Sequence, residues 1–318
     1  MKLQTQVLLQ KTKTPIDYDS QLLLLGSCFA NNIGLKLQHL QFQHLSNPFG
    51  NLFHPLAITN LISNAITEKK YTAEDIFLQN ERWHCFDAHS DLSDPSKEST
   101  LTQLNDGIEK TREQLYKSTH VIITLGTAWV YKHLLLNRRV ANCHKIPVSA
   151  FEKELLSIEE ITASLQQLVQ AIKKINAKAI VVFTVSPVRH LKDGFVENQL
   201  SKAHLIASVH SVLKCTEATY FPAYELMMDE LRDYRFYEAD MVHPNALAVS
   251  YIWEKFKASW LSKDSYATME KVKTVQSGLS HKPFNASSTE HQRFLKSLEE
   301  KITYLKKTYP FMDFSLRG

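Results

Sequence analysis

The sequence has few of the residues that mark a disulfide-rich, metal-binding or membrane-spanning protein. It has only four cysteines, and they form no CxxC pair or Cys/His cluster at metal-ligand spacing. We therefore expect free thiols, a reducing compartment and no metal site. No apolar run reaches the roughly 18 residues that a membrane helix needs, and the first residues lack the apolar core of a signal peptide. The sequence thus predicts a cytoplasmic protein that does not insert into membranes.

An excess of charge of one sign is also missing. Lys and Arg number 37 and Asp and Glu number 33, for a formal net charge of +4, and the basic residues are scattered along the chain. We therefore expect no nucleic-acid partner. A content of 44% hydrophobic and 22% charged residues in 318 residues is typical of one large globular domain or two small ones.

Short, continuous apolar runs predict strands that are buried on both faces, as in a parallel sheet. They lie at residues 22–26, 121–126 and 179–186, with a weaker run at 219–224. Helical stripes of apolar residues lie between and after them, at 29–40, 101–115, 165–175 and 249–256. This alternation predicts an α/β fold with a mostly parallel sheet, in which ligands bind beyond the carboxyl ends of the strands.

The C-terminal part of the chain differs in composition. Residues 263–278 are polar, and Ser287 and Glu290 then have the spacing of a capping box before an apolar stripe at 294–305. We therefore expect a main α/β domain at 1–262 and a C-terminal helical extension at 263–318. The extension would pack on the domain or on a partner subunit, so a homo-oligomer is one of the two alternatives.

Polar or glycine-containing segments follow the apolar runs, where a parallel sheet would gather them at one edge. These segments contain Ser27, Gly126 with Thr127, Arg189 with His190, and, before the last helical stripe, Asp240 with His243. A serine nucleophile needs a base, and a histidine base needs a carboxylate to fix its tautomer. The types and spacing of Ser27, Asp240 and His243 suit these three roles. Ser27 also precedes a predicted helix, and an N-cap is the alternative role.

Several longer stretches resemble one family. They are "GSCFANNIG", "NPFG", "TLGTAWVY", "VANCHK", "FTVSPVRHLKDGFVENQLSKAHL", "YFPAYELMMDELRDYRFYEADMVHPN" and "HKPFN". Together they resemble the GSCFA family, a bacterial branch of the SGNH/GDSL hydrolase superfamily. The resemblance implies a flavodoxin-like three-layer α/β/α sandwich. It also implies that Ser27 attacks, that His243 takes its proton and that Asp240 orients His243.

The resemblance further implies an oxyanion hole. The backbone N–H groups of Ser27 or Cys28 and of Gly50 would fill this role. The superfamily's third block supplies an asparagine, but Ala128 stands at that position here. Asn47 and Asn142 are the candidates to replace it.

The implied activity is that of a serine esterase without a cofactor. The expected substrate is a carboxylic ester with a small acyl group on a polar carrier, which is a small molecule or a glycan. An O-acyltransferase with the same triad and a catalytically silent ligand-binding protein are the alternatives. We assign Gly126, Thr127, Arg189 and His190 to substrate binding, with Arg189 suited to a carboxylate or phosphate. An ion-paired loop that includes Lys202 is the alternative role for this region.

Overall fold

A five-stranded parallel sheet forms the centre of the computed structural model, which describes residues 4–315. Its strands are β1 (Gln21–Gly26), β2 (Gln43–Ser46), β5 (His120–Leu125), β9 (Ile180–Val185) and β10 (Thr219–Tyr220). They lie in the order β2-β1-β5-β9-β10, and every pairing is parallel. This is the strand order of flavodoxin-like sheets. The predicted α/β fold with a mostly parallel sheet is therefore confirmed.

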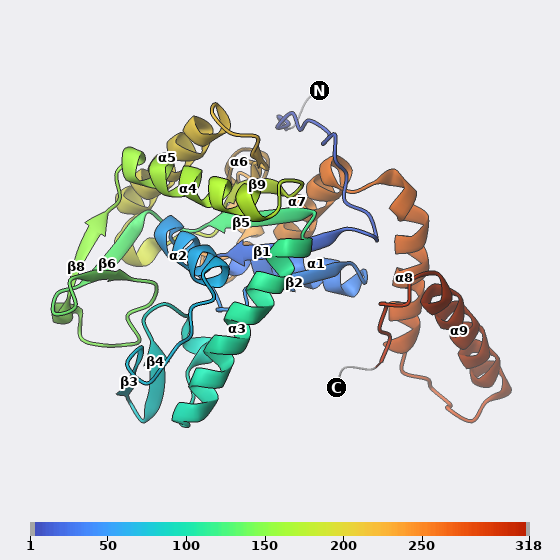
Figure 1. Cartoon of the computed structure of the whole chain (residues 1–318). Coiled ribbons are helices and arrows are strands. Elements are labelled where there is room, and N and C mark those ends of the chain that lie inside the picture. The colour runs from blue at the N-terminus through green and yellow to red at the C-terminus, as the bar shows by residue number, and fades with distance from the viewer. Residues whose placement is uncertain (1–3, 316–318) are drawn as a thin grey trace.

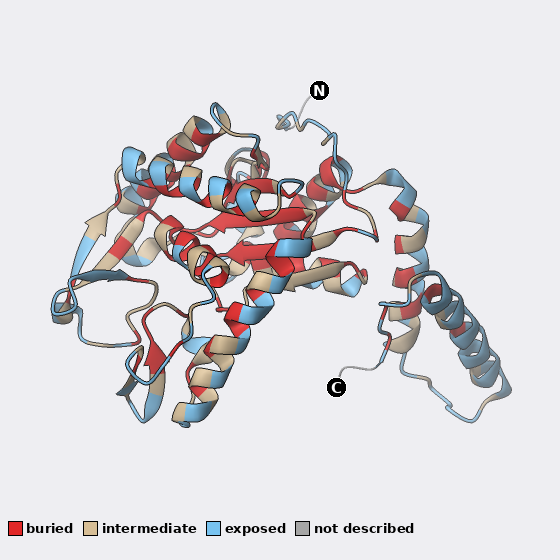
Figure 2. Cartoon of the chain, in the orientation of Figure 1, coloured by how far each residue is buried: buried red, intermediate tan, exposed pale blue. Residues whose placement is uncertain are grey.

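Helices cover both faces of the sheet and make the three layers (Figure 1). One face carries α2 (Pro55–Ile66), α3 (Lys97–Lys117), α4 (Ile158–Ile175) and α5 (Phe195–Leu213), and the other carries α1 (Cys28–His39) and α7 (Ala246–Trp260). Side chains alternate between these layers along each strand: Leu23 and Leu25 enter the first core, whereas Leu22 and Leu24 enter the second. The strands are buried on both sides (Figure 2), which explains their continuous hydrophobicity.

Two small antiparallel sheets and several short helical turns complete the main body. The hairpin joins β3 (Ile76–Gln79) to β4 (Arg82–Cys85), and the second sheet has the order β7 (Arg138–Val140), β6 (Trp129–His133), β8 (Phe151–Leu155). The turns are η1 (Ser90–Leu92), η2 (Val148–Ala150), η3 (Leu191–Asp193), α6 (Ala223–Glu225), η4 (Leu226–Glu230), η5 (Tyr234–Phe236) and η6 (Lys263–Ser265). Within residues 4–315, none of the helices has the length and hydrophobicity needed to cross a bilayer.

The C-terminal extension is a pair of helices, α8 (Tyr266–Leu279) and α9 (Thr289–Thr308), that projects from the main body (Figure 1). Met269, Val272 and Val275 of α8 are fully buried and join the same core as α1 and α7. Leu298 and Leu305 of α9 reach that core as well. The extension therefore packs on the domain.

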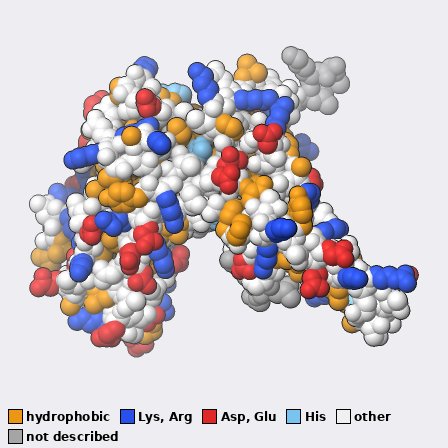
Figure 3. Space-filling model, turned by 45° about the vertical axis from the view of Figure 1, so that its right-hand side comes forward, with side chains coloured by type: hydrophobic (Ala, Val, Ile, Leu, Met, Phe, Trp, Pro, Cys, Tyr) orange, Lys and Arg blue, Asp and Glu red, His pale blue; other side chains and the backbone are white. Residues whose placement is uncertain are grey.

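Acidic and basic side chains are interspersed over the face of the molecule in Figure 3.

The capping box expected at the start of α9 does not form. Ser288, rather than Ser287, is the N-cap, and its hydroxyl accepts a hydrogen bond from the N–H of His291. Ser287 instead donates its hydroxyl proton to Asn285 at 2.8 Å. The asparagine offers Ser287 a local partner, so the helix begins one residue later than the spacing predicted.

Candidate active site

Ser27 lies at the carboxyl end of β1, where the chain turns sharply into α1. Gly26 permits the turn, because it has φ +127° and a Cβ there would lie 2.0 Å from the carbonyl oxygen of Thr124. Ser27 is the N-cap residue of α1, but its side chain makes no capping hydrogen bond. The residue has no exposed surface, and its Oγ has no partner among the described residues. An unpaired buried hydroxyl costs about 1–3 kcal/mol, so a helix cap does not explain this serine.

Asp240 and His243 form a preassembled pair in the loop before α7. Oδ2 of Asp240 lies 2.7 Å from Nδ1 of His243, and both side chains are about half exposed. The backbone and ring of His243 and the N–H of Val242 bond to the carboxylate and lower the pKa of Asp240 to about 2. Nε2 of His243 has no hydrogen-bond partner within residues 4–315, so the pair presents an oriented imidazole with one nitrogen unused.

Backbone hydrogen bonds fix this loop against the end of β9. The N–H of Glu238 donates to the carbonyl of His243 at 2.8 Å, which closes the loop on itself. The N–H of Arg189 donates to the carbonyl of Val242 at 3.2 Å. The loop after β9 and the Asp240–His243 loop therefore touch, and the structure brings Arg189 and His190 beside the residue that precedes His243.

His190 lies at the end of β5 with an unsatisfied ring nitrogen. A Cβ on Gly126 would come within 3.3 Å of its Nε2, and the Phe53 ring packs edge-on against it with centroids 5.7 Å apart. Nε2 is buried and has no partner in the described part of the chain. Burial, followed by the charges of Lys202 and His243, lowers the pKa of His190 to about 3. The imidazole is therefore neutral at physiological pH.

Lys202 on α5 is a part of this site that the sequence did not reveal. It is fully buried, and its Nζ donates to the carbonyls of Gly126 at 2.7 Å and Ser186 at 2.8 Å, the residues that directly follow β5 and β9. It forms no ion pair with the described residues, so the ion-paired role considered for it is wrong. Burial lowers the pKa of Lys202 to about 7, although the nearby Cys28 raises it slightly. Lys202 holds two strand ends together at the site.

This lysine makes stability depend on pH. The pKa of Lys202 is about 7 in the folded chain, against 10.5 for an ordinary lysine, so between these pH values the unfolded chain binds more protons. Stability from this residue should therefore rise as pH increases from about 7 to about 10. In thermal or urea unfolding, the free energy of unfolding of wild type should rise over this pH range relative to that of Lys202→Met. Lys214→Met, at the exposed C-cap of the same helix, is the control, and an equally flat difference for both variants would contradict the expectation.

Two of the predicted backbone oxyanion donors are already used. The N–H of Ser27 donates to the carbonyl of Thr124 at 3.0 Å, and the N–H of Gly50 donates to the carbonyl of Asn47 at 2.8 Å. Burial raises the pKa of the neighbouring Cys28 thiol, and the cysteine's own backbone N–H lowers that pKa by a smaller amount. An oxyanion could use the first two donors only after their present bonds break.

The two asparagines proposed as replacement donors lie in different places. Asn47 is next to the site: its Oδ1 accepts from the N–H of Gly26 at 2.8 Å, while its Nδ2 donates to Asn31 and Asn51 at 2.8 and 3.0 Å. Both of its amide protons are therefore committed. Asn142 lies on the wall of a separate cavity, where its nearest acceptor for Nδ2 is 3.5 Å away.

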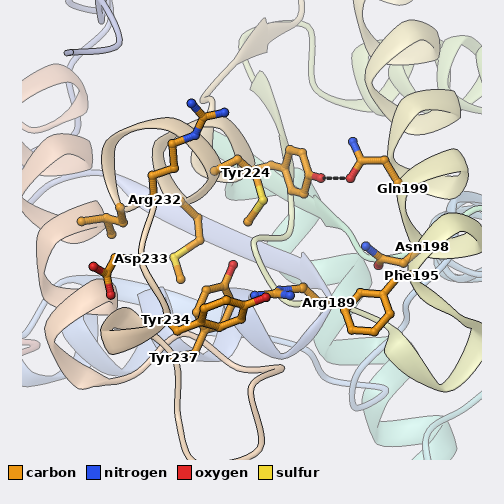
Figure 4. A pocket seen from close by; sticks show the side chains of 12 residues that line it. Arg189, Phe195, Asn198, Gln199, Tyr224, Arg232, Asp233, Tyr234 and Tyr237 are labelled. Atoms are coloured by element: carbon orange, nitrogen blue, oxygen red, sulfur yellow. Dashed lines mark hydrogen bonds between the residues drawn. The ribbon is translucent and has the colours of Figure 1, made fainter. Parts of the chain in front are cut away.

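Two cavities flank the loop after β9. The larger one, of about 770 Å³, lies between this loop and the β6–β8 sheet, and Phe53, Thr127, Asn142 and His190 are among its lining residues. The smaller one, of about 270 Å³, is lined by Arg189 (Figure 4). Thus three of the predicted substrate-binding residues line cavities. The fourth, Gly126, instead gives its carbonyl oxygen to Lys202.

Fold and site together define a three-layer α/β protein whose polar residues converge at the carboxyl edge of a flavodoxin-like sheet. Residues 21–256 match the GSCFA family, and residues 272–316 match the C-terminal domain of GSCFA domain proteins. The chain therefore belongs to the GSCFA family, and the resemblance inferred from its sequence is confirmed. A comparison with curated proteins gives no match.

Proposed function

We propose that this protein is a serine esterase that hydrolyses a carboxylic ester through an acyl-enzyme. The observation that carries the proposal is the Asp240–His243 pair, with Nδ1 bonded to the carboxylate at 2.7 Å and Nε2 unused. The buried, unpaired hydroxyl of Ser27 supports it, because native proteins rarely leave such a group unpaired without a functional reason.

In the proposed reaction, Ser27 Oγ attacks the ester carbonyl while Nε2 of His243 takes its proton. Asp240 stabilises the resulting imidazolium and keeps the ring in the correct tautomer. The tetrahedral intermediate then expels the alcohol, which receives the proton from His243. Water repeats these steps to release the acid and restore the Ser27 hydroxyl. If an alcohol replaces water in this second half, the same residues catalyse O-acyl transfer.

The burial of Ser27 adds one requirement and favours one rival function. Because Ser27 has no exposed surface and no hydrogen bond to His243, the edge of the sheet must open before a substrate reaches Oγ. A protein that binds a ligand at this edge without reacting with it would have no need to expose Ser27. Ala128 stands where the superfamily has an asparagine, and its side chain carries no hydrogen-bond donor. This also favours the catalytically silent alternative.

A fluorophosphonate probe tests the proposal against this alternative. The probe forms a covalent bond only with an activated serine, so Ser27 of the folded wild-type protein should be labelled and should appear in the modified peptide by mass spectrometry. A folded protein whose Ser27 stays unmodified, and which hydrolyses no short p-nitrophenyl ester, would replace the esterase by the silent ligand-binding function.

We also propose that Nε2 of His190 supplies the oxyanion donor that Ala128 cannot. His190 lies beside Gly126, its buried Nε2 has no partner, and its low pKa of about 3 keeps the ring neutral. In the tautomer that carries the proton on Nε2, this nitrogen can donate to a developing oxyanion. A neutral imidazole can serve as such a donor without giving up its proton.

Replacement of His190 should therefore slow turnover far more than it weakens binding. Removal of one oxyanion donor typically lowers kcat by about a hundredfold to a thousandfold. We expect a loss of this size in His190→Ala and a smaller loss in His190→Gln, whose amide retains an N–H donor. Steady-state kinetics on p-nitrophenyl acetate would measure both. Equal kcat in wild type and His190→Ala would assign the donor to another group.

We place the enzyme in the cytoplasm, with a small-molecule or glycan ester as its substrate. Support comes from the four cysteines, all of which are free in the structure. Thiols that stay unpaired are typical of a reducing compartment.

A further inference from the structure

The cavity of about 270 Å³ beside the Asp240–His243 loop has the features of an anion-binding site. Its walls come from α5, from the π-helical turn η4 and from the loop that precedes Asp240. The lining residues are Arg189, Phe195, Asn198, Gln199, Tyr224, Met227, Met228, Leu231, Arg232, Asp233, Tyr234 and Tyr237. Apolar and aromatic side chains thus surround two arginines, and π-helical turns are often found at functional sites.

Arg189 is held rigidly at one end of this cavity (Figure 4). Its guanidinium carbon lies 4.1 Å from the ring centre of Tyr237 and 5.3 Å from that of Tyr234. Stacking on tyrosine rings fixes the plane of a guanidinium without using up its N–H donors. Nε of Arg189 is buried and has no hydrogen-bond partner among residues 4–315. Arg189 is thus a fixed cation: Tyr234 and Tyr237 interact with its guanidinium, and its Nε–H is left without a partner among residues 4–315.

Among the described residues, no carboxylate neutralises the two cavity arginines. Within the described residues, neither Arg189 nor Arg232 forms an ion pair. The one acidic residue of the lining, Asp233, is the ion-pair partner of Arg235 at 3.7 Å. Figure 4 shows Arg232 at the end of the cavity away from Arg189. The cavity therefore has a positive charge that a bound anion would balance.

The cavity shares its wall with the candidate catalytic loop. Tyr237, which stacks on Arg189, forms a backbone bridge with Pro244, the residue after His243. The backbone N–H of Arg189 donates to the carbonyl of Val242, the residue before His243. A group bound by Arg189 would therefore lie close to the imidazole that handles the proton of the leaving alcohol. In an ester substrate, the part of the molecule nearest that proton is the carrier.

We propose that this cavity binds a carboxylate or phosphate on the carrier of the ester, with Arg189 as the main contact and Arg232 as a second one. The inference rests on the proposed esterase function for the role of the anion, but binding of the anion does not depend on catalysis. Arginine suits both groups, because its N–H fork matches two oxygens of either one. The apolar walls would pack against the body of the carrier.

Three acetate esters with matched rings test the proposal. They are 4-nitrophenyl acetate, which is neutral, 4-acetoxybenzoate, which carries a carboxylate, and 4-acetoxyphenyl phosphate. We expect Arg189→Gln to lower kcat/KM about tenfold to a hundredfold more for one or both anionic esters than for the neutral ester. Whichever anionic ester is more affected identifies the anion. Arg232→Gln should act in the same direction with a smaller effect.

Lys214→Gln is the matched control, since it removes an exposed positive charge at the end of α5, outside the cavity lining, and Lys214 forms no ion pair with the described residues. It should treat all three esters as wild type does. If Arg189→Gln and Arg232→Gln lower kcat/KM equally for neutral and anionic esters, or leave all three unchanged, the cavity does not recognise an anion. The exposed Arg232 decides the matter if Arg189→Gln fails to fold.

Calorimetric titration with benzoate and phenyl phosphate separates this inference from the proposed function. Binding that weakens at least tenfold in Arg189→Gln, in a protein that hydrolyses no ester, would preserve the anion site and reject the esterase. Hydrolysis that depends on Ser27, in a protein that binds neither anion, would preserve the esterase and reject the anion site.

Discussion

Replacement of Ser27 by alanine should abolish ester hydrolysis and leave the folded protein at least as stable as wild type. The first expectation follows because no other group would form the acyl-enzyme. The second follows because Oγ of Ser27 is buried without a partner, and its removal relieves an unsatisfied polar group that costs about 1–3 kcal/mol. Turnover of p-nitrophenyl acetate and a thermal melt measure the two effects on the same preparation.

The stability result also distinguishes the two roles considered for this serine. A helix N-cap lost to alanine costs about 0.5–2 kcal/mol, so a lower melting temperature in Ser27→Ala would favour the capping role. Ser46→Ala is the matched control, because Oγ of Ser46 on the neighbouring strand β2 is likewise buried and unpartnered. It should keep full activity. Cys28→Ala should retain most activity, since the thiol has no part in the proposed chemistry, and full turnover in Ser27→Ala would remove Ser27 from the mechanism.

The central sheet could be predicted because burial on both faces leaves a strong pattern. β1, β5 and β9 coincide with continuous apolar runs. The run at 219–224 was too long, because Pro222 has no N–H to pair and the chain turns into α6 after β10. The edge strand β2, of sequence QHLS and only half buried, gave no such pattern.

The candidate site was only partly visible in the sequence. Ser27, Asp240 and His243 stand in short blocks that resemble a family pattern, so they could be assigned. The location of Lys202 depends on which face of α5 meets the sheet, and the pairing of its ammonium with two strand ends is a long-range contact. The unpaired Nε2 of His190 is likewise a property of packing around Gly126 and Phe53. Such contacts follow from the assembled fold rather than from residue spacing.

Replacement of Asp240 by asparagine should lower kcat by a factor that approaches about ten thousand, as in the serine-protease template. The amide keeps the size of the side chain, but it removes the charge that stabilises the imidazolium. It can also donate to Nδ1 of His243 and thus select the tautomer in which Nε2 already carries a proton and cannot act as a base. The carboxylate of Asp240 is half exposed, so the fold should survive the change.

The pH profile separates this role from a merely structural one. The low pKa of Asp240, about 2, means that its carboxylate stays charged throughout the range in which the protein can be assayed. The negative charge is lost only as pH falls through that value. A fall of wild-type activity at mildly acidic pH should therefore not come from protonation of Asp240. Glu238→Gln neutralises an exposed carboxylate in the same loop whose side chain forms no hydrogen bond or ion pair with the described residues, and it should behave as wild type. If Asp240→Asn loses no more activity than Glu238→Gln, the 2.7 Å bond to His243 only shapes the loop, and the proposed triad is wrong.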